Sequence, residues 1–157
     1  MTVYRGPPLA GGPVSLAEPH EHGLAAALQG ADIGDDEKAW FARAAGDETI
    51  CYFAIERDAR LIGQVMLHDI DWSASEALVG YHIFLPEDRG QGSGSAALAA
   101  ACRYALGQFG LRRLVAITTY DNAASRRIAA KAGFREIGPA REGPHLVAYE
   151  LVAAPPA

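Results

Sequence analysis

The spacing of hydrophobic residues changes along the chain, and the predicted secondary structure changes with it. In the first 46 residues, apolar positions such as Leu24, Ala27 and Leu28 recur at helical spacing and predict helices over Pro19–Leu28 and Asp35–Ala45. The next 40 or so residues carry short runs of β-forming residues separated by turn residues, which is typical of an antiparallel meander. We expect its strands over Ile50–Ile55, Leu61–Ile70 and Glu76–Leu85.

Helices and strands alternate in the second half of the chain. The segment Ala96–Phe109 keeps Leu98, Cys102 and Ala105 on one helical stripe, and Gly110 ends this helix. The order of elements predicts a mixed α/β (α+β) fold, with helices layered on one central sheet. The remaining predicted elements are a helix over Asn122–Ala132 and strands over Val14–Ala17, Leu114–Thr119, Phe134–Ile137 and Val147–Leu151.

Length and composition fit one globular domain. We expect the 157 residues to form a single domain, with a core over residues 14–152 and irregular ends at 1–13 and 153–157. Fourteen Lys and Arg against 19 Asp and Glu give a net charge of −5, so no global basic field attracts nucleic acid. No apolar run approaches the ~18–20 residues of a membrane helix, so we expect no membrane partner.

The cysteines and histidines argue against a metal site. Cys51 and Cys102 lie far apart in apolar stretches, which is typical of buried thiols in a reducing compartment and favours a cytoplasmic location. His20 and His22 flank Glu21 near a predicted helix start, but their spacing is not i,i+4 and no third ligand accompanies them. We therefore expect no metal ion.

A glycine-rich loop between a predicted strand and a predicted helix carries the clearest chemical signal. Successive glycines let backbone N–H groups converge, and the positive end of the next helix adds to them, so the loop suits a phosphate or pyrophosphate. A merely flexible turn explains one or two glycines, but three at alternate positions less easily. The loop consists of Arg89, Gly90, Gln91, Gly92, Ser93, Gly94 and Ser95.

Three binding motifs compete for this loop. The segment Gly92–Ala97 matches the dinucleotide fingerprint G-x-G-x-x-A, but Arg112 and Arg113 occupy the zone where an acidic residue should hold the ribose. The loop does not match the nucleotide-binding Walker motif, because no Gly-Lys-Ser/Thr follows its glycines. The third pattern is R-x-x-G-x-G, which the loop satisfies with Arg89 as its first residue.

This third pattern resembles the coenzyme A pyrophosphate loop of the GCN5-related N-acetyltransferase (GNAT) superfamily. A second block, Asp121–Arg135, is similar to the N-x-x-S…K-x-G-F segment of that superfamily, and Gly80-Tyr81 and Val147–Leu151 match as well. The resemblance spans about residues 14–152. Within the superfamily, the sequence pattern is most similar to the branch that includes the ribosomal-protein N-terminal acetyltransferases. This branch also contains enzymes that act on small amines.

The resemblance implies a specific architecture and a co-substrate. It implies a six- to seven-stranded, mostly antiparallel sheet flanked by about four helices. Two neighbouring parallel strands, Glu76–Leu85 and Leu114–Thr119, would splay apart, and the pantetheine arm of acetyl-CoA would enter between them and pair with the open edge of the first strand. The expected cofactor-binding residues are His82, Ile83, Phe84, Arg89, Gly90, Gln91, Gly92, Ser93, Gly94, Ser95, Asn122, Ser125 and Arg127.

The resemblance also implies roles in catalysis. The backbone N–H near His82 would hold the acetyl carbonyl, and Ser125 would donate to the sulfur of coenzyme A. Asn122 would contact the cofactor arm, but it is equally a good helix N-cap. Many relatives carry a tyrosine as general acid where this chain has Ala129, which shifts this role to Ser125 or to water.

The general base stays open among three candidates. Some relatives carry a glutamate at the position of Leu78, which this chain lacks. Glu76 and His82 lie on the same face of the predicted strand as that position, so either can take the role, or water can. Alternatively, neither residue takes part in catalysis: Glu76 is then a solvated residue at the end of the strand, and His82 is a packed residue.

The predicted function is therefore an N-acetyltransferase that moves an acetyl group from acetyl-CoA to a primary amine of a small molecule or a peptide. A non-catalytic acyl-CoA-binding domain would carry the same loop, and a dinucleotide oxidoreductase is a third class. Asp69, Asp71 and Trp72 form either a solvated turn or a border of the acceptor site. The chain is expected to be a monomer or a homodimer.

Overall fold

The structure is a computed structural model, and it describes residues 2–3, 8–17 and 47–155. The helices predicted over Pro19–Leu28 and Asp35–Ala45 lie outside the described residues, as do His20 and His22.

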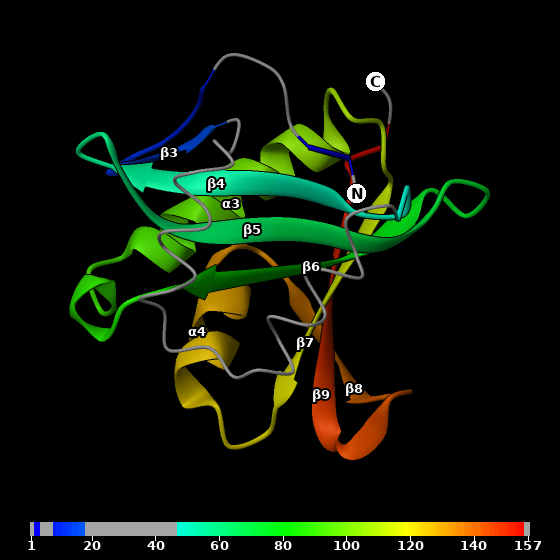
Figure 1. The fold of residues 1–157 in the computed structure, drawn as a ribbon. Coiled ribbons are helices and arrows are strands. Elements are labelled where there is room, and N and C mark those ends of the chain that lie inside the picture. Colours follow the sequence, from blue (N-terminus) through cyan, green and yellow to red (C-terminus); the bar gives the residue numbers. More distant parts are fainter. Residues whose placement is uncertain (1, 4–7, 18–46, 156–157) are drawn as a thin grey trace.

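A single nine-stranded sheet dominates the described part of the chain (Figure 1). Its strands follow the order β2-β3-β4-β5-β6-β7-β9-β8, and the short β1 pairs in parallel with the start of β4. All other neighbours are antiparallel except β6 and β7. The strands are β1 (Thr2–Val3), β2 (Leu9–Gly11), β3 (Val14–Ala17), β4 (Cys51–Arg57), β5 (Arg60–Asp71), β6 (Glu76–Ile83), β7 (Arg113–Thr119), β8 (Arg135–Ala140) and β9 (Gly143–Val152).

The parallel strands β6 and β7 separate soon after they begin. Their pairing covers only Glu76–Leu78 on β6 and Arg113–Val115 on β7. Beyond this point β6 runs on to Ile83 and β7 to Thr119, and the two strands diverge (Figure 1). The splayed pair expected from the resemblance is confirmed.

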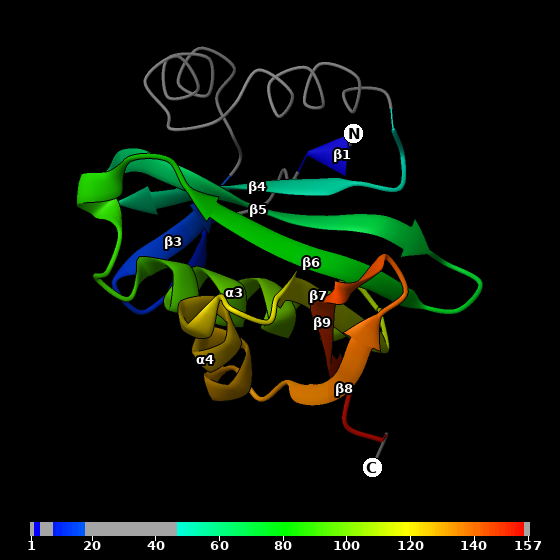
Figure 2. The same cartoon turned by 90° about the horizontal axis from the view of Figure 1, so that it is seen from below.

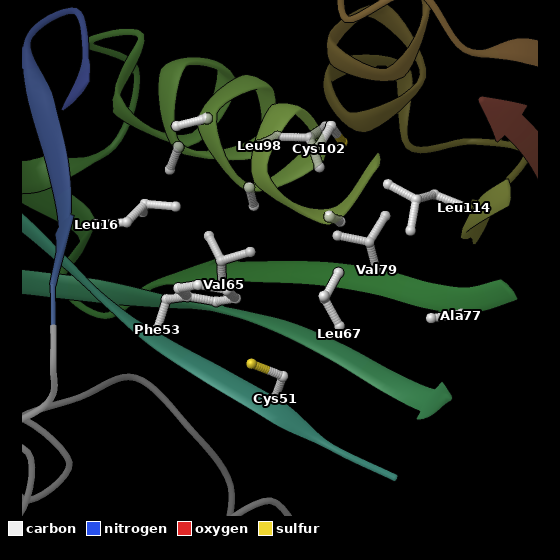
Figure 3. Packing of buried hydrophobic residues seen from close by; sticks show 14 of the residues in the cluster. Leu16, Cys51, Phe53, Val65, Leu67, Ala77, Val79, Leu98, Cys102 and Leu114 are labelled. Carbon is white, nitrogen blue, oxygen red and sulfur yellow. The ribbon is translucent and has the colours of Figure 1, made fainter. Parts of the chain in front are cut away.

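Two helices, α3 (Ser93–Leu106) and α4 (Ala123–Lys131), lie on the same face of the sheet (Figure 2). The core lies between α3 and this face, where Phe53, Val65 and Val79 of the sheet meet Leu98 and Cys102 of the helix (Figure 3). The small residues along α3, many of them alanines, let the helix approach the sheet closely. None of the helices in the described ranges is both long and apolar enough to cross a membrane.

The predicted strands and the two later helices are confirmed, with shifted ends. Helix α3 begins at Ser93 because the loop enters helical geometry directly after the left-handed Gly92, and it ends at Leu106 because Gly107 leaves helical geometry. Strand β6 stops at Ile83, since the chain then turns into a short 3₁₀ helix, η1 (Pro86–Asp88).

The expectation of an irregular N-terminal end is wrong for β1 and β2. Gly12, with a φ of 65°, forms the turn of a hairpin with Pro13, and β2 pairs with β3 across it. The Pro/Gly-rich stretch therefore closes a hairpin instead of forming an irregular end. With β1 and β2 the sheet has nine strands, more than the six or seven expected.

Candidate functional site

A cavity of about 820 Å³ lies where β6 and β7 separate. It is lined by β6, the glycine-rich loop, the start of α3, β7 and α4. Most of the site residues predicted from the sequence contribute to this lining, namely His82, Ile83, Arg89, Gly90, Gly92, Ser93, Gly94, Ser95, Asn122, Ser125 and Arg127. Three others, Glu76, Phe84 and Gln91, are not in its lining.

One wall of the cavity is the edge of β6 that faces the gap. Val79–Ile83 line the cavity, while the pairing of β6 with β7 ends at Leu78. The backbone groups on this edge therefore have no partner in β7. An extended ligand with amide groups fits such an edge because it can continue the hydrogen-bonding ladder.

The glycine-rich loop has the geometry of an anion site. Gly90 and Gly92 have φ values of 72° and 80°, in the left-handed region that favours glycine, and an added Cβ at either would have no neighbour within 4 Å. Gly92 is the N-cap of α3, and no side-chain cap bonds the first N–H groups of this helix. These N–H groups and the positive end of the helix suit a phosphate oxygen.

Two arginines of the β4–β5 hairpin brace this loop. The Arg57 guanidinium donates to Ser93 Oγ at 2.8 Å, and Arg60 donates to the two carboxylate oxygens of Asp88 at 3.0 and 2.5 Å. The Asp88 side chain is only 7% exposed, and the hydrogen bonds from Arg60 hold the pKa of its carboxyl below the usual range. Sequence reasoning missed both arginines, because the hairpin that carries them lies about 30 residues before the loop.

Arg89 supports the loop from inside. Its Nε donates to the carbonyl of Ile83 at 3.0 Å, and a second guanidinium nitrogen lies 3.4 Å from the carbonyl of Phe84. The N–H of Phe84 donates to the carbonyl of Ile62 at 2.9 Å. Both backbone groups of Phe84 therefore already have hydrogen-bond partners within the protein.

Tyr81 connects three of the elements that surround the cavity: β6, α3 and α4. It lies on β6, and its ring packs so closely on Gly94 of α3 that an added Cβ would be 2.6 Å from Cε2. Burial raises the pKa of Tyr81, while the interaction of its hydroxyl with the side chain of Ser125 on α4 lowers it. Only the Gly80-Tyr81 match pointed to this residue, and it gave no role.

Helix α4 presents its N-terminus and one basic edge to the site. Asn122 caps the helix, since its Oδ1 accepts from the N–H of Ser125 at 3.1 Å. Arg127 and Lys131 line the cavity, whereas Arg126 is bound to Glu136 at 2.7 Å. The N-cap role expected for Asn122 is thus confirmed.

Glu76 lies at the closed end of the parallel pair. It forms an ion pair with Arg113 at 3.0 Å, and Arg113 in turn binds Glu150 at 2.9 Å. His82 lies six residues further along β6, about 20 Å away at the usual rise of a strand. The structure therefore brings His82 to the cavity but not Glu76, because the strands separate only beyond Leu78.

The comparisons agree with this geometry. Residues 25–135 match the family model described as "Acetyltransferase (GNAT) domain". The chain is 34% identical over 86 residues to the Bacillus subtilis protein named "Putative ribosomal N-acetyltransferase YdaF", an alignment that covers 55% of this chain and 46% of that protein. A second protein of the same organism, "Uncharacterized N-acetyltransferase YoaA", is 33% identical over 87 residues, which cover 55% of this chain and 49% of that protein. The chain thus spans about half the length of these relatives.

Solved structures show the same fold. A GNAT-family acetyltransferase from Bacillus anthracis superposes with a TM-score of 0.73 at 17% identity, covering 93% of this chain and 98% of that one. A mutant of the spermidine N-acetyltransferase SpeG from Vibrio cholerae gives a TM-score of 0.72 at 17% identity, covering 89% and 94%. The family match over most of the chain and this shared fold lead to one conclusion: the chain belongs to the GNAT acetyltransferase family.

Proposed function

We propose that the protein transfers an acetyl group from acetyl-CoA to a primary amine, which attacks the thioester directly. The observation that carries this proposal is the cavity itself, which combines an open strand edge on β6 with an anion site at the start of α3. An elongated ligand with amide groups at one end and phosphates at the other is complementary to both. The pantetheine and pyrophosphate of coenzyme A have this order.

The described residues fit coenzyme A along its length. The edge formed by Val79–Ile83 would pair with the pantetheine amides, and the N–H groups of residues 90–95 would hold the pyrophosphate. Arg127 and Lys131 line the same cavity and supply positive charge for the remaining phosphate. Arg57 and Arg60 would act indirectly, by keeping the loop in place.

The reaction requires a neutral attacking amine, a stabilised oxyanion and a proton for the leaving thiolate. In the addition step the amine nitrogen bonds to the carbonyl carbon, and a backbone N–H near His82 would stabilise the negative oxygen; such donors are worth ~10²–10³ in rate. The C–S bond then breaks, and its electron pair stays on sulfur. Ser125 would donate a proton to this thiolate and regain one from the attacking nitrogen, which loses it to become the neutral amide; the Tyr81 hydroxyl interacts with the Ser125 side chain.

The acceptor is proposed as a class, a primary amine of a small molecule or of a peptide N-terminus. The relatives named for ribosomal and spermidine acetylation fall into these two groups. Cys51 and Cys102 are both free and buried, which supports a cytoplasmic site of action.

Thiol release measures this activity directly. The purified protein is mixed with acetyl-CoA and with each member of a panel of polyamines, aminoglycosides and peptides with free N-termini, and free coenzyme A is followed with a thiol reagent. Turnover with at least one amine supports the proposal. Coenzyme A binding by calorimetry without turnover on any amine would favour a non-catalytic acyl-CoA-binding domain.

A matched pair of glycine variants tests the binding site. Gly92 and Gly110 both have left-handed φ values and open space where an added Cβ would lie, but only Gly92 lines the cavity. Gly92→Ala should weaken coenzyme A binding, whereas Gly110→Ala should cost similar stability and leave binding unchanged. Equal binding by both variants would contradict the placement of the pyrophosphate.

A further inference from the structure

A histidine–aspartate pair lies on β5, outside the cavity lining. His68 Nδ1 is 2.7 Å from the Oδ2 of the neighbouring Asp69. The His68 side chain is 30% exposed and that of Asp69 is 72% exposed. The carboxylate accepts the hydrogen on Nδ1, so Nε2 is left as the nitrogen that can accept a proton.

An unusual backbone conformation at Asp69 brings the two side chains together. Asp69 has a φ of 49°, in the left-handed region that side chains other than glycine rarely adopt. It lies in an irregularity of β5, where the register with β6 shifts between His68 and Asp71. Neighbours on a regular strand point to opposite faces, whereas this irregularity brings the carboxylate beside the preceding imidazole.

The imidazole reaches across β6 toward the gap between the parallel strands. His68 pairs with Leu78, the last residue of β6 that is paired with β7. Its Nε2 is 4.0 Å from the position that a Cβ on Gly80 would take. Because Gly80 has no side chain and itself lines the cavity, no side chain at this position separates the nitrogen from the cleft.

We propose that His68 is the general base of the acetyl transfer, with Asp69 as its positioning residue; this rests on the proposed function. Nε2 takes a proton from the ammonium form of the acceptor, directly or through one water molecule, as the neutral nitrogen attacks the thioester carbon. The C–N bond forms and the C–S bond breaks with its electron pair on sulfur, which takes the second proton that the nitrogen loses. The imidazolium that results from the first proton transfer is stabilised by the Asp69 carboxylate. Leu78, the cross-strand neighbour of His68, is apolar and cannot take this role itself.

Other titratable groups lie on this face of the described strands. Asp71, the cross-strand neighbour of Glu76, accepts a hydrogen bond from the Ser73 hydroxyl at 2.6 Å. Glu76 is bound to Arg113, and the Tyr52 hydroxyl donates to Gln64 at 2.6 Å. His82 lies on the same face of β6, two residues beyond Gly80. It is therefore the alternative base that the experiment must distinguish from His68.

The pH dependence of kcat/KM separates these possibilities. With the best alkyl-amine acceptor of the panel, the wild type should show an acidic limb between pH 5 and 8, where histidines titrate. His68→Ala should lower kcat/KM at pH 7 by ~10²–10³ and remove this limb, because a positioned base contributes ~10²–10⁴. Coenzyme A binding should be unchanged, since His68 does not line the cavity.

A second acceptor distinguishes a base from a structural residue. Hydroxylamine is largely neutral at pH 7 and needs no base before attack, so His68→Ala should acetylate it nearly as fast as the wild type. Asp69→Asn should retain part of the activity and shift the limb, and the exposed histidine of β9, changed in His145→Gln, serves as the control.

The outcomes are distinct. An unchanged limb in His68→Ala, or its loss only in His82→Ala, overturns the role of His68 and leaves the proposed function standing. Equal loss with both acceptors would make His68 structural. If the wild type acetylates no amine, both proposals fail together.

Discussion

A glycine can be required in this loop for either of two reasons: a left-handed backbone conformation, or space for the ring of Tyr81. Gly94 is a case of the second. Unlike Gly90 and Gly92, Gly94 has no positive φ, and its Cβ would meet Cε2 of Tyr81 at 2.6 Å and Cδ2 at 3.2 Å. Carbon atoms prefer ~3.5–4.0 Å, so an alanine must push the ring by roughly 1 Å. We therefore expect Gly94→Ala to act through Tyr81.

The size of the effect follows from two opposing contributions. Overpacking of this kind costs about 1–3 kcal/mol, whereas alanine in place of glycine inside a helix gains about 0.5–1 kcal/mol and less in its first turn. Gly94→Ala should therefore destabilise the wild type by about 1–2 kcal/mol, the resultant of these contributions. Coenzyme A affinity should also fall, because the displaced ring lines the cavity.

A double-mutant cycle tests the mechanism by the sign of the effect. Tyr81→Val removes the clashing ring atoms and keeps a β-forming residue on β6. In that background Gly94→Ala should be neutral or slightly stabilising, which gives a coupling energy of about 1–3 kcal/mol. Urea unfolding of the four proteins measures it.

The left-handed Gly92 provides the control. Gly92→Ala should lower the free energy of unfolding by about 1–2 kcal/mol through backbone strain. The loss should be the same in the wild type and in the Tyr81→Val background. The reasoning is refuted if Gly94→Ala costs the same in both backgrounds, or if it stabilises the wild type.

The remaining predictions concern side chains at and below the site. Ser125→Ala should lower kcat with little change in acetyl-CoA affinity, and an unchanged kcat in steady-state kinetics would remove Ser125 from the mechanism. Burial raises the pKa of Cys51 to about 11 and of Cys102 to about 12, so a thiol reagent at pH 8 should modify neither in the native protein and both after unfolding. Arg60 lowers the pKa of Asp88, so the stability that this ion pair contributes is present above ~pH 4 and is lost as the pH falls through the folded pKa of Asp88. The difference in Tm between the wild type and Arg60→Ala should therefore shrink as the pH falls below ~4. A difference in Tm that stays constant with pH would contradict this prediction.

Local features of the chain were predictable because their causes are local. Short runs of β-forming residues between turn residues predict β4, β5 and β6, and the helical stripe of Leu98 and Cys102 predicts α3. The cap at Asn122 also follows from local chemistry, since its side chain bonds an N–H three residues away. The Pro/Gly-rich start misled the prediction, because such residues suit a hairpin turn as well as an irregular end.

The site depended on distances between segments, which no local pattern contains. The loop glycines were recognised from their spacing, but the reason for Gly94 is the ring of Tyr81 on another element. Glu76 and His82 were equivalent candidates on one strand face. They differ in the structure because β6 leaves β7 after Leu78, so only His82 reaches the cavity.

The sequence by itself determined the order of elements, the anion-binding loop and the likeness to the GNAT family, because periodicity, turn chemistry and motif spacing are properties of short segments. Only the tertiary structure decided which side chains meet at the cleft. It brings Arg57 and Arg60 into hydrogen-bond contact with the loop and with Asp88 beside it, and it places Tyr81 near Ser125 and His68 near Gly80. Strand register and the point where two strands separate control these contacts, and both arise from packing of the whole sheet.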